Sequence, residues 1–146
     1  MLEYTSIPSA YFETVMKMPQ SPAYRYRDSN GDKITITYKE LYDKINAITK
    51  AFEIKGFASK NVAIFSENRI EWFICDMALL SLGSVDVPRG DDSTSEELNY
   101  IIEHSESKAV LVENKYVFDK IKNHHDDLSL IIFLDSSMHN PDKNIY

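Results

Sequence analysis

The chain has few of the residues that mark several common classes of site. Cys75 is its single cysteine, which excludes an internal disulfide and a cysteine metal cluster and is typical of a reducing compartment. Its four glycines stand apart, at Gly31, Gly56, Gly83 and Gly90. With that spacing neither G-x-G-x-x-G nor G-x-x-x-x-G-K-[ST] can be written, so the sequence contains no glycine-rich phosphate loop.

Long apolar runs and targeting segments are also missing. The longest apolar stretch, Trp72–Leu82, is interrupted by Asp76 and Ser81 and is too short to span a bilayer. The first residues, MLEYTSIPSAYF, lack a basic region followed by an apolar one, so no signal peptide is predicted. Together with the single cysteine, these features predict a soluble protein of the cytoplasm.

Basic residues are in deficit. The 16 Lys and Arg residues are outnumbered by 23 Asp and Glu residues, which gives a net charge of -7 and no basic stripe. This balance argues against nucleic-acid binding and against binding to an anionic membrane as the main role. A length of 146 residues is that of one domain with a sizeable core.

Two features are predicted at the beginning of the chain. Residues 1–23 form an N-terminal arm, with a short helix over Ser9–Lys17 that ends before Pro19 and Pro22. This helix is expected to carry Phe12, Val15 and Met16 on one side. The turn residues 28–32 (DSNGD) lie between alternating Tyr and Ile residues, which predicts a β-hairpin.

Strands and helices then alternate over residues 24–135, before a polar tail at 136–146. Predicted strands are Asn61–Phe65, Val85–Val87, Lys108–Val112 and Leu130–Leu134. Predicted helices are Tyr38–Lys55, Arg69–Leu82, Glu96–Ser105 and Tyr116–Asn123. This alternation predicts an α/β fold with a mostly parallel sheet and flanking helices, preceded by the arm and the hairpin.

Helix starts show polar capping patterns. Thr37 with Glu40, and Asn68 with Glu71, fit capping boxes, and Ser93 or Thr94 is expected to cap the helix that follows. The helix beginning near Asn68 is apolar almost all round, so it must be covered on more than one side. If part of it stays uncovered, the chain is expected to form homodimers through apolar surface.

Three segments of the chain, in this order, resemble the sequence pattern of one superfamily. They read TYKELYDKINAITKAF, VAIFSENRIEWFICDMALLSLGSVDVP and STSEELNYIIEHSESKAVLVEN. Together they resemble the N-terminal part of AMP-forming acyl-CoA synthetases, members of the adenylate-forming superfamily. The pattern S-x-N-R-x-E-W followed by G-x-V-x-V-P is nearest to long-chain fatty-acid–CoA ligases. The resemblance covers Ser6 to Leu134 and implies the N-terminal subdomain of the adenylate-forming fold.

The resemblance also implies an activity for a longer enzyme. Such ligases activate a fatty acid with ATP and magnesium to an acyl-adenylate, then transfer the acyl group to CoA. Their Ser/Thr/Gly-rich phosphate loop, Y-G-x-T-E segment, ribose-binding Asp and catalytic Lys cannot be placed on this sequence. The chain is therefore expected to be an N-terminal fragment, inactive alone, whose partners are the rest of the ligase and its fatty-acid substrate. For the longer enzyme, a cytoplasmic location with peripheral membrane association is expected.

By the same resemblance, two segments approach the CoA nucleotide. One follows the second predicted parallel strand and holds Arg89, Gly90 and Ser93; the other holds Lys115. The residues themselves also fit a capped loop with a solvated charge cluster. Arg69 is expected to pair with Glu67 or Glu71. No residue of the chain is predicted to be catalytic. No metal ligand is predicted either, because the adjacent His124 and His125 point apart.

Two other classes of protein share this length and alternation. One is a stand-alone flavodoxin-like or receiver-like binding domain. Flavodoxins need a Ser/Thr/Gly phosphate loop, and receivers need clustered acids after the first strand, where this chain has Ser66-Glu67-Asn68. The other is an interaction module without enzymatic activity, which the apolar Trp72–Leu82 segment supports.

Overall fold

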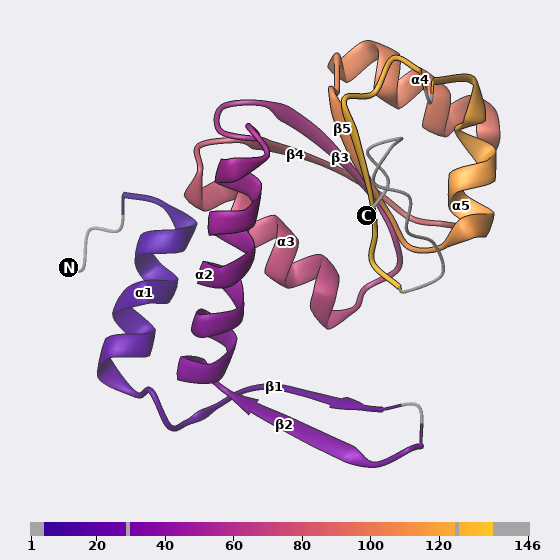
Figure 1. Ribbon diagram of the computed structural model, residues 1–146. Coiled ribbons are helices and arrows are strands. Elements are labelled where there is room, and N and C mark those ends of the chain that lie inside the picture. Colours follow the sequence, from indigo (N-terminus) through magenta and orange to yellow (C-terminus); the bar gives the residue numbers. More distant parts are fainter. Residues whose placement is uncertain (1–4, 29, 125, 136–146) are drawn as a thin grey trace.

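The computed structural model describes residues 5–28, 30–124 and 126–135, and Figure 1 shows their arrangement. The strands are β1 (Pro22–Arg27), β2 (Lys33–Thr37), β3 (Asn61–Phe65), β4 (Val85–Arg89), β5 (Ala109–Val112) and β6 (Leu130–Phe133). The helices are α1 (Ile7–Lys17), α2 (Tyr38–Ile54), α3 (Ile70–Ser81), α4 (Ser95–Ser105), α5 (Lys115–Lys120) and the 3-10 turn η1 (Lys122–His124). The predicted polar tail at 136–146 lies outside the described residues.

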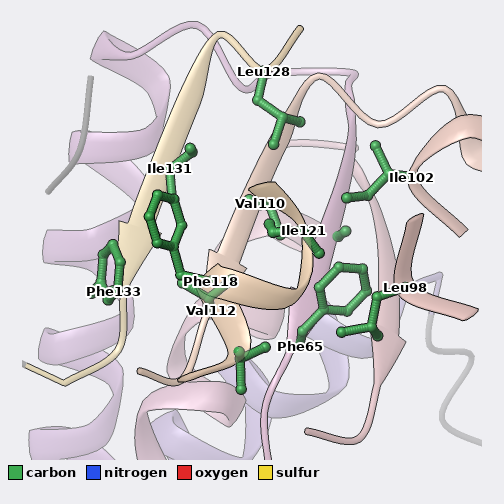
Figure 2. Close-up of a cluster of buried hydrophobic side chains, with 12 residues drawn as sticks. Phe65, Leu98, Ile102, Val110, Val112, Phe118, Ile121, Leu128, Ile131 and Phe133 are labelled. Atoms are coloured by element: carbon green, nitrogen blue, oxygen red, sulfur yellow. The ribbon is translucent and has the colours of Figure 1, made fainter. Parts of the chain in front are cut away.

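A four-stranded sheet in the order β4-β3-β5-β6 forms the centre of the fold, and each adjacent pair of strands is parallel. Alternate side chains face opposite sides of this sheet. Val62, Ile64 and Leu111 pack towards α2 and α3. The other face packs against α4 and α5, as Figure 2 shows; it carries Ala63, Phe65, Val110, Val112, Ile131 and Phe133. The predicted α/β fold with a parallel sheet and flanking helices is confirmed.

The hairpin is also present. β1 and β2 pair antiparallel, with Tyr24 opposite Ile36. In the turn, Asp28 Oδ1 accepts hydrogen bonds from the backbone N–H groups of Asn30 and Asp32, both at 2.9 Å. Gly31 adopts φ +84°, a left-handed conformation that glycine enters at little cost. The hairpin strands lead directly into α2.

Helix α3, which is apolar almost all round, is covered by two layers of this chain. It lies between the sheet on one side and α2 with α1 on the other. Its buried residues are Ile70, Ile74, Cys75, Met77, Ala78 and Leu79. The expectation that this helix must be covered on more than one side is confirmed, and the covering elements belong to the described part of the chain.

The predicted capping box of Asn68 and Glu71 is wrong. Helix α3 starts at Ile70, and its N-cap residue, Arg69, makes no side-chain capping bond. Glu71 instead accepts a hydrogen bond from Arg69 Nε at 2.7 Å. The capping box of Thr37 and Glu40 is present, and α4 is capped by Thr94 in a box with Glu97. Of the two candidate caps for α4, Thr94 is therefore the one used.

Helix α1 buries a different side from the one predicted. Val15 is buried, but the Phe12 side chain is 44% exposed and Met16 is 68% exposed. Tyr11 instead packs against the apolar cluster of the hairpin, α2 and α3, and its ring centroid lies 6.2 Å from that of Phe73 in α3. The helix begins at Ile7, two residues earlier than predicted, because Ser6 and Ser9 form a capping box.

The remaining boundaries differ by a few residues. Strand β4 extends to Arg89, and the predicted last helix divides into α5 and η1. Gly56 and Gly83 follow α2 and α3 with φ of +79° and +66°, as expected of glycines at helix C-termini. Among the helices of the described residues, none combines the length and the hydropathy needed to cross a membrane.

Candidate functional site

A cleft of about 630 Å³ opens at the carboxyl ends of β3 and β4. In a parallel sheet ligands favour this edge, above all where neighbouring strands send their connections to opposite faces. β3 and β5 are such neighbours, because β3 continues into α3 on one face and β5 into α5 on the other. The lining residues are Ser66, Glu67, Asn68, Trp72, Pro88, Arg89, Gly90, Asp91 and Asp92.

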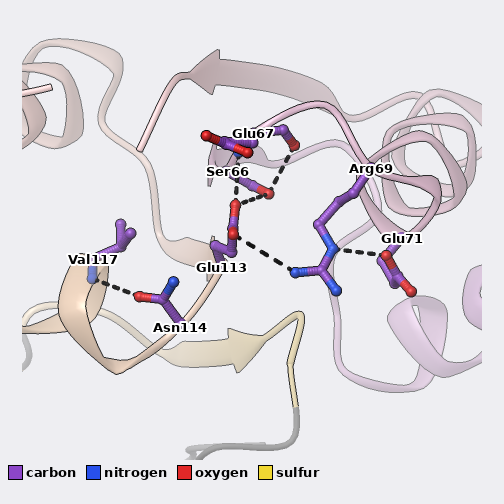
Figure 3. A network of polar contacts seen from close by, with 7 residues as sticks. All are labelled: Ser66, Glu67, Arg69, Glu71, Glu113, Asn114 and Val117. Atoms are coloured by element: carbon purple, nitrogen blue, oxygen red, sulfur yellow. Dashed lines mark hydrogen bonds and ion pairs between the residues drawn. The ribbon is translucent and has the colours of Figure 1, made fainter. Parts of the chain in front are cut away.

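Glu113 directly follows β5, and its side chain contacts the loop that leads from β3 to α3 (Figure 3). Its Oε2 accepts a hydrogen bond from Ser66 Oγ at 2.9 Å and another from the Glu67 backbone N–H at 2.8 Å. Its Oε1 lies 3.9 Å from Arg69 Nη1. A carboxylate that is only 18% exposed is thus satisfied by two donors and one charge, and it fixes the loop that lines the cleft.

Arg69 carries the positive charge of this network. Its Nε donates to Glu71 at 2.7 Å, so the predicted pairing with Glu71 is confirmed. Desolvation alone would lower the pKa of its guanidinium, but the hydrogen bond to Glu71 and the charges of Glu71, Glu113 and Asp135 outweigh burial and raise the pKa. Arg69 remains a cation held between α3 and the end of β5.

The Arg89 side chain forms hydrogen bonds with residues at the start of α4. Its Nε donates to Ser93 Oγ at 3.0 Å, and its Nη2 donates to Glu97 at 3.4 Å. The hydrogen bond that Glu97 accepts from the Thr94 backbone N–H lowers the pKa of its carboxyl, and the Arg89 charge lowers it further. A Cβ atom at Gly90 would lie 2.7 Å from Asp92 Oδ1, so a larger residue there would push the exposed Asp92 carboxylate aside.

The two lysines of α5, Lys115 and Lys120, each bind oxygen atoms of this chain. Lys120 Nζ donates to the carbonyl oxygens of Asp91 at 2.6 Å and Ser93 at 2.8 Å, which ties α5 to the β4–α4 loop. The same Nζ lies 4.4 Å from the centroid of the Tyr116 ring. Lys115 Nζ lies 2.7 Å from Asp119, one turn further along α5, on the exposed surface.

The four predicted CoA-contacting residues therefore fall in two places. Arg89, Gly90 and Ser93 form one loop, and the Arg89–Ser93 contact brings two of them together. Lys115 lies at the start of α5 and pairs within that helix. Both cations have carboxylate partners, as in the alternative of a solvated charge cluster. Whether either meets CoA stays a prediction.

Glu113 is a site residue that the sequence interpretation missed. The signal was its position, since an acid directly after a buried strand reaches the same sheet edge as residues 66–69. In the residues that the structure describes, no group of three or more His, Cys, Asp or Glu side chains is placed to hold a metal ion. The charged residues that line the cleft are thus mostly acidic, and its one guanidinium, that of Arg89, is paired with Glu97.

Comparison with solved structures gives the class of fold. The chain superposes on a mutant form of coronafacic acid ligase from Pectobacterium brasiliense with a TM-score of 0.83, over 97% of this chain and 28% of that one. Sequence identity is 19%, so this likeness shows the fold alone. The fold is that of the N-terminal subdomain of adenylate-forming enzymes.

Sequence comparison then gives the family. Residues 11–144 match the sequence pattern described as AMP-binding enzyme, and the chain belongs to that family. It is 30% identical over 124 residues to the chloroplastic long-chain-fatty-acid–[acyl-carrier-protein] ligase AEE15 of Arabidopsis thaliana, covering 80% of this chain and 17% of that protein. It is also 30% identical over 112 residues to the long-chain-fatty-acid–CoA ligase FadD15 of Mycobacterium tuberculosis, covering 76% of this chain and 18% of that protein. The match thus spans less than a fifth of these relatives.

Proposed function

We propose that this chain is the N-terminal part of an enzyme that activates long-chain fatty acids with ATP and transfers the acyl group to CoA. The observation that carries the proposal is the family match over residues 11–144. The fatty-acid assignment is supported by the names of AEE15 and FadD15, both long-chain fatty-acid ligases. The pattern SENRIEW followed by GSVDVP favours the CoA ligases among the acyl-activating enzymes.

An acyl carrier protein is the competing acceptor, because AEE15 is named for one. Acidic partners need a basic docking surface, whereas this chain carries a net charge of -7. The cations near the cleft, Arg89 and Arg69, are both engaged by carboxylates. These charges speak against docking of an acidic protein on this part of the enzyme, and the choice of CoA as acceptor rests on the pattern of SENRIEW and GSVDVP.

ATP and magnesium fit poorly on the described residues. The cleft is lined by Glu67, Asp91 and Asp92 against one guanidinium, which opposes a triphosphate. The part of the chain seen in the structure also has no cluster of three acidic, His or Cys ligands for a cation. In the proposal, the groups that bind ATP and magnesium belong to the rest of the enzyme, and this chain supplies scaffold.

Arg89 and Lys115 are proposed to lie near CoA in the longer enzyme. Arg89→Ala and Lys115→Ala are then expected to raise the KM for CoA several-fold and to leave fatty-acid-dependent ATP–pyrophosphate exchange unchanged. Lys39→Ala is the matched control, since Lys39 forms an equivalent exposed i,i+4 pair with Asp43. An equal effect of Lys39→Ala and Lys115→Ala on the KM for CoA would remove Lys115 from the site.

The proposed function is tested by comparing this chain with the longer enzyme. The longer enzyme should release pyrophosphate when given ATP, magnesium and a long-chain fatty acid, and should form a thioester with CoA. The 146-residue chain alone should release none. Pyrophosphate release by the chain alone would contradict the fragment interpretation and favour a complete catalytic unit.

A stand-alone flavodoxin-like binding or interaction domain is the alternative. The family match over residues 11–144 speaks for the enzyme instead. Binding of flavin mononucleotide by the chain, followed by flavin fluorescence quenching, would support the alternative. For the longer enzyme we propose a cytoplasmic location with peripheral membrane association.

A further inference from the structure

The hairpin of β1 and β2 carries cationic side chains on the face that points away from the helices. Tyr24, Ile34 and Ile36 belong to the apolar cluster formed with α2 and α3. Side chains alternate along a strand, so the residues between them lie on the other, outer face. The outer face is exposed and consists of Arg25, Arg27, Lys33 and Thr35. Together with Tyr26 and Ile34, these residues line a hollow of about 520 Å³.

Two of the cations lie directly opposite each other in the pairing of the strands. Arg27 is opposite Lys33, and Arg25 is opposite Thr35. The Cβ atoms of opposite residues are about 5 Å apart, and like charges in such positions destabilise a hairpin. Arg25 and Arg27 are separated by about 7 Å along β1, from the rise per residue of a strand. The pairing of Arg27 with Lys33 therefore works against the stability of the hairpin, and packing does not explain it.

None of the three cations has a carboxylate partner among the described residues. The ion pairs there join other side chains, and Arg25, Arg27 and Lys33 take part in none of them. Arg27 Nη1 donates to the Gly31 carbonyl oxygen at 2.6 Å, which holds the guanidinium near the turn and leaves its charge uncompensated. The outer face thus presents three unpaired positive charges, in a chain whose net charge is -7.

The two acids of the turn fall on the other side of the hairpin. The Asp28 backbone N–H donates to the Asp32 carbonyl oxygen at 3.0 Å, so these two residues continue the pairing one step beyond the strands. By the alternation of side chains, both carboxylates then lie on the side of the hairpin that meets α2 and α3. Asp28 Oδ1 in addition accepts two backbone N–H groups of the turn. Acids and cations are therefore separated onto opposite sides.

We propose that the outer face of the hairpin binds the phosphate group of a small phosphorylated molecule. A guanidinium binds phosphate oxygen atoms through paired N–H donors, and two guanidinium groups stand side by side on β1. Lys33 adds a third positive charge, and the Thr35 hydroxyl is a further donor. The face belongs to a different element from the acidic cleft, and the proposal does not depend on the proposed ligase activity.

The extent of the cationic surface favours a small ligand over a macromolecule. Recognition of anionic lipids takes clusters of about 4–8 Lys and Arg residues. A stable protein interface covers about 800 Å² on each partner, and the net charge of -7 repels an acidic partner of that size. A hollow of about 520 Å³ with three cations is within the range of small-molecule sites, about 300–1,000 Å³.

Titration of the 146-residue chain with sodium pyrophosphate tests the proposal, with backbone amide signals followed by NMR at constant ionic strength. Signals of residues 23–27 and 33–37 are expected to shift until the site is saturated. Signals of residues 66–68, in the acidic cleft, should stay in place. Sodium citrate, an anion without phosphate, is the control ligand. Absence of shifts with pyrophosphate, or equal shifts with citrate, would overturn the proposal.

Variants separate a phosphate site from general attraction of anions. Arg25→Ala and Arg27→Ala should each raise the dissociation constant for pyrophosphate roughly tenfold, because each removes a charge-assisted contact. Lys50→Ala removes an exposed cation of α2 and is the matched control, which should leave the constant unchanged. An equal rise in all three variants would overturn the proposal. Association with phosphatidylglycerol vesicles, without a response to pyrophosphate, would overturn it in favour of a membrane surface.

Lys33→Glu gives a second readout that a purely structural lysine would not give. The new carboxylate would face Arg27 across the strands, so the midpoint of urea denaturation should rise while pyrophosphate binding is lost. A lower midpoint would show that Lys33 serves the fold, and unchanged binding would remove Lys33 from the site; either result overturns the proposal. These readouts do not involve release of pyrophosphate from ATP, so the proposed function is tested separately.

Discussion

Asp76 on α3 and Asp86 on β4 form a carboxyl pair at the contact between that helix and the edge of the sheet. Burial raises the pKa of Asp76 from 3.8 to about 6, and the charge of Asp86 and a hydrogen bond with it add to the rise. A group whose pKa is higher in the folded state stabilises the fold most below its unfolded pKa. That contribution is lost as the pH rises from 3.8 through about 6.

Asp76→Asn is therefore expected to stabilise the protein at pH 7 and to have little effect at pH 4, since the amide stays neutral and still donates to Asp86. A shift of two units would correspond to about 3 kcal/mol, but Asp76 is half exposed, so screening reduces the expected gain to about 1 kcal/mol. Urea denaturation at both pH values measures it. Asp43→Asn, an exposed carboxylate on α2, is the control. A gain that does not change with pH would refute the assignment.

Glu113 holds the loop after β3 against the end of β5, through its contacts with Ser66, Glu67 and Arg69. Glu113→Ala should lower the free energy of unfolding by about 1–3 kcal/mol, because the Glu67 N–H loses its acceptor and the Ser66 hydroxyl is left with the Glu67 carbonyl alone. Glu113→Gln keeps an acceptor oxygen and should cost clearly less. Glu53→Ala, on the exposed side of α2, is the control for loss of a glutamate. Equal losses for Glu113→Ala and Glu53→Ala would show that the network does not stabilise the fold.

At the scale of elements, local patterns predicted most of the structure and failed where a distant partner intervened. T-x-x-E at Thr37 and N-x-x-E at Asn68 are equivalent signals in the sequence, yet only the first forms a capping box. Glu71 instead pairs with Arg69, which also lies near Glu113, directly after strand β5 and far along the chain. Such a contact depends on the packing of β5 beside β3, which no local pattern encodes.

This difference between the two patterns can be measured. Thr37→Ala should lower the free energy of unfolding by about 1 kcal/mol, since Thr37 Oγ1 accepts the N–H of Glu40 at the start of α2. Asn68→Ala should have a much smaller effect, because the exposed Asn68 does not cap α3. Chemical denaturation of the two variants compares them directly. A loss at Asn68 as large as that at Thr37 would mean that Asn68 caps α3 in solution.

Helix α1 shows a second limit of local patterns. The spacing of Phe12, Val15 and Met16 defines an apolar side, but it does not say which edge of that side meets the neighbours. In the structure Tyr11 packs against the cluster of α2 and α3 and Val15 is buried, whereas Phe12 is 44% exposed and its ring lies 5.6 Å from that of Tyr42. The angle at which α1 crosses α2 and α3 decides this, and that angle depends on tertiary packing.

For the whole molecule, the sequence located the sheet edge at which the candidate site lies but not the contacts within it. Arg89, Gly90 and Ser93 were expected together because they follow one strand, and they do form one loop. The pairing of Arg89 with Glu97 and the bridge from Glu113 to Ser66 join residues of different elements. The order of the strands had to be known before either contact could be expected.

Two of the three apolar clusters are joined through α2 and α3, and the third shares strands β3, β5 and β6 with one of them, so the chain should unfold in one step. Ile48 of α2 packs against both the cluster beneath the sheet and the cluster at the hairpin and α1. Fluorescence of Trp72, the single tryptophan, reports on α3, and far-UV circular dichroism reports on the whole chain. The two signals should change at the same denaturant concentration.

Ile48→Ala should shift both transitions together, by about 1–3 kcal/mol for a half-buried isoleucine. Ile54→Ala on the same helix is the matched control, since Ile54 is 84% exposed and should shift neither. Separate transitions of the two signals would mean that the hairpin with α1 is an independently unfolding unit. A shift of only one signal by Ile48→Ala would lead to the same conclusion, because α2 would then stabilise one cluster without the other.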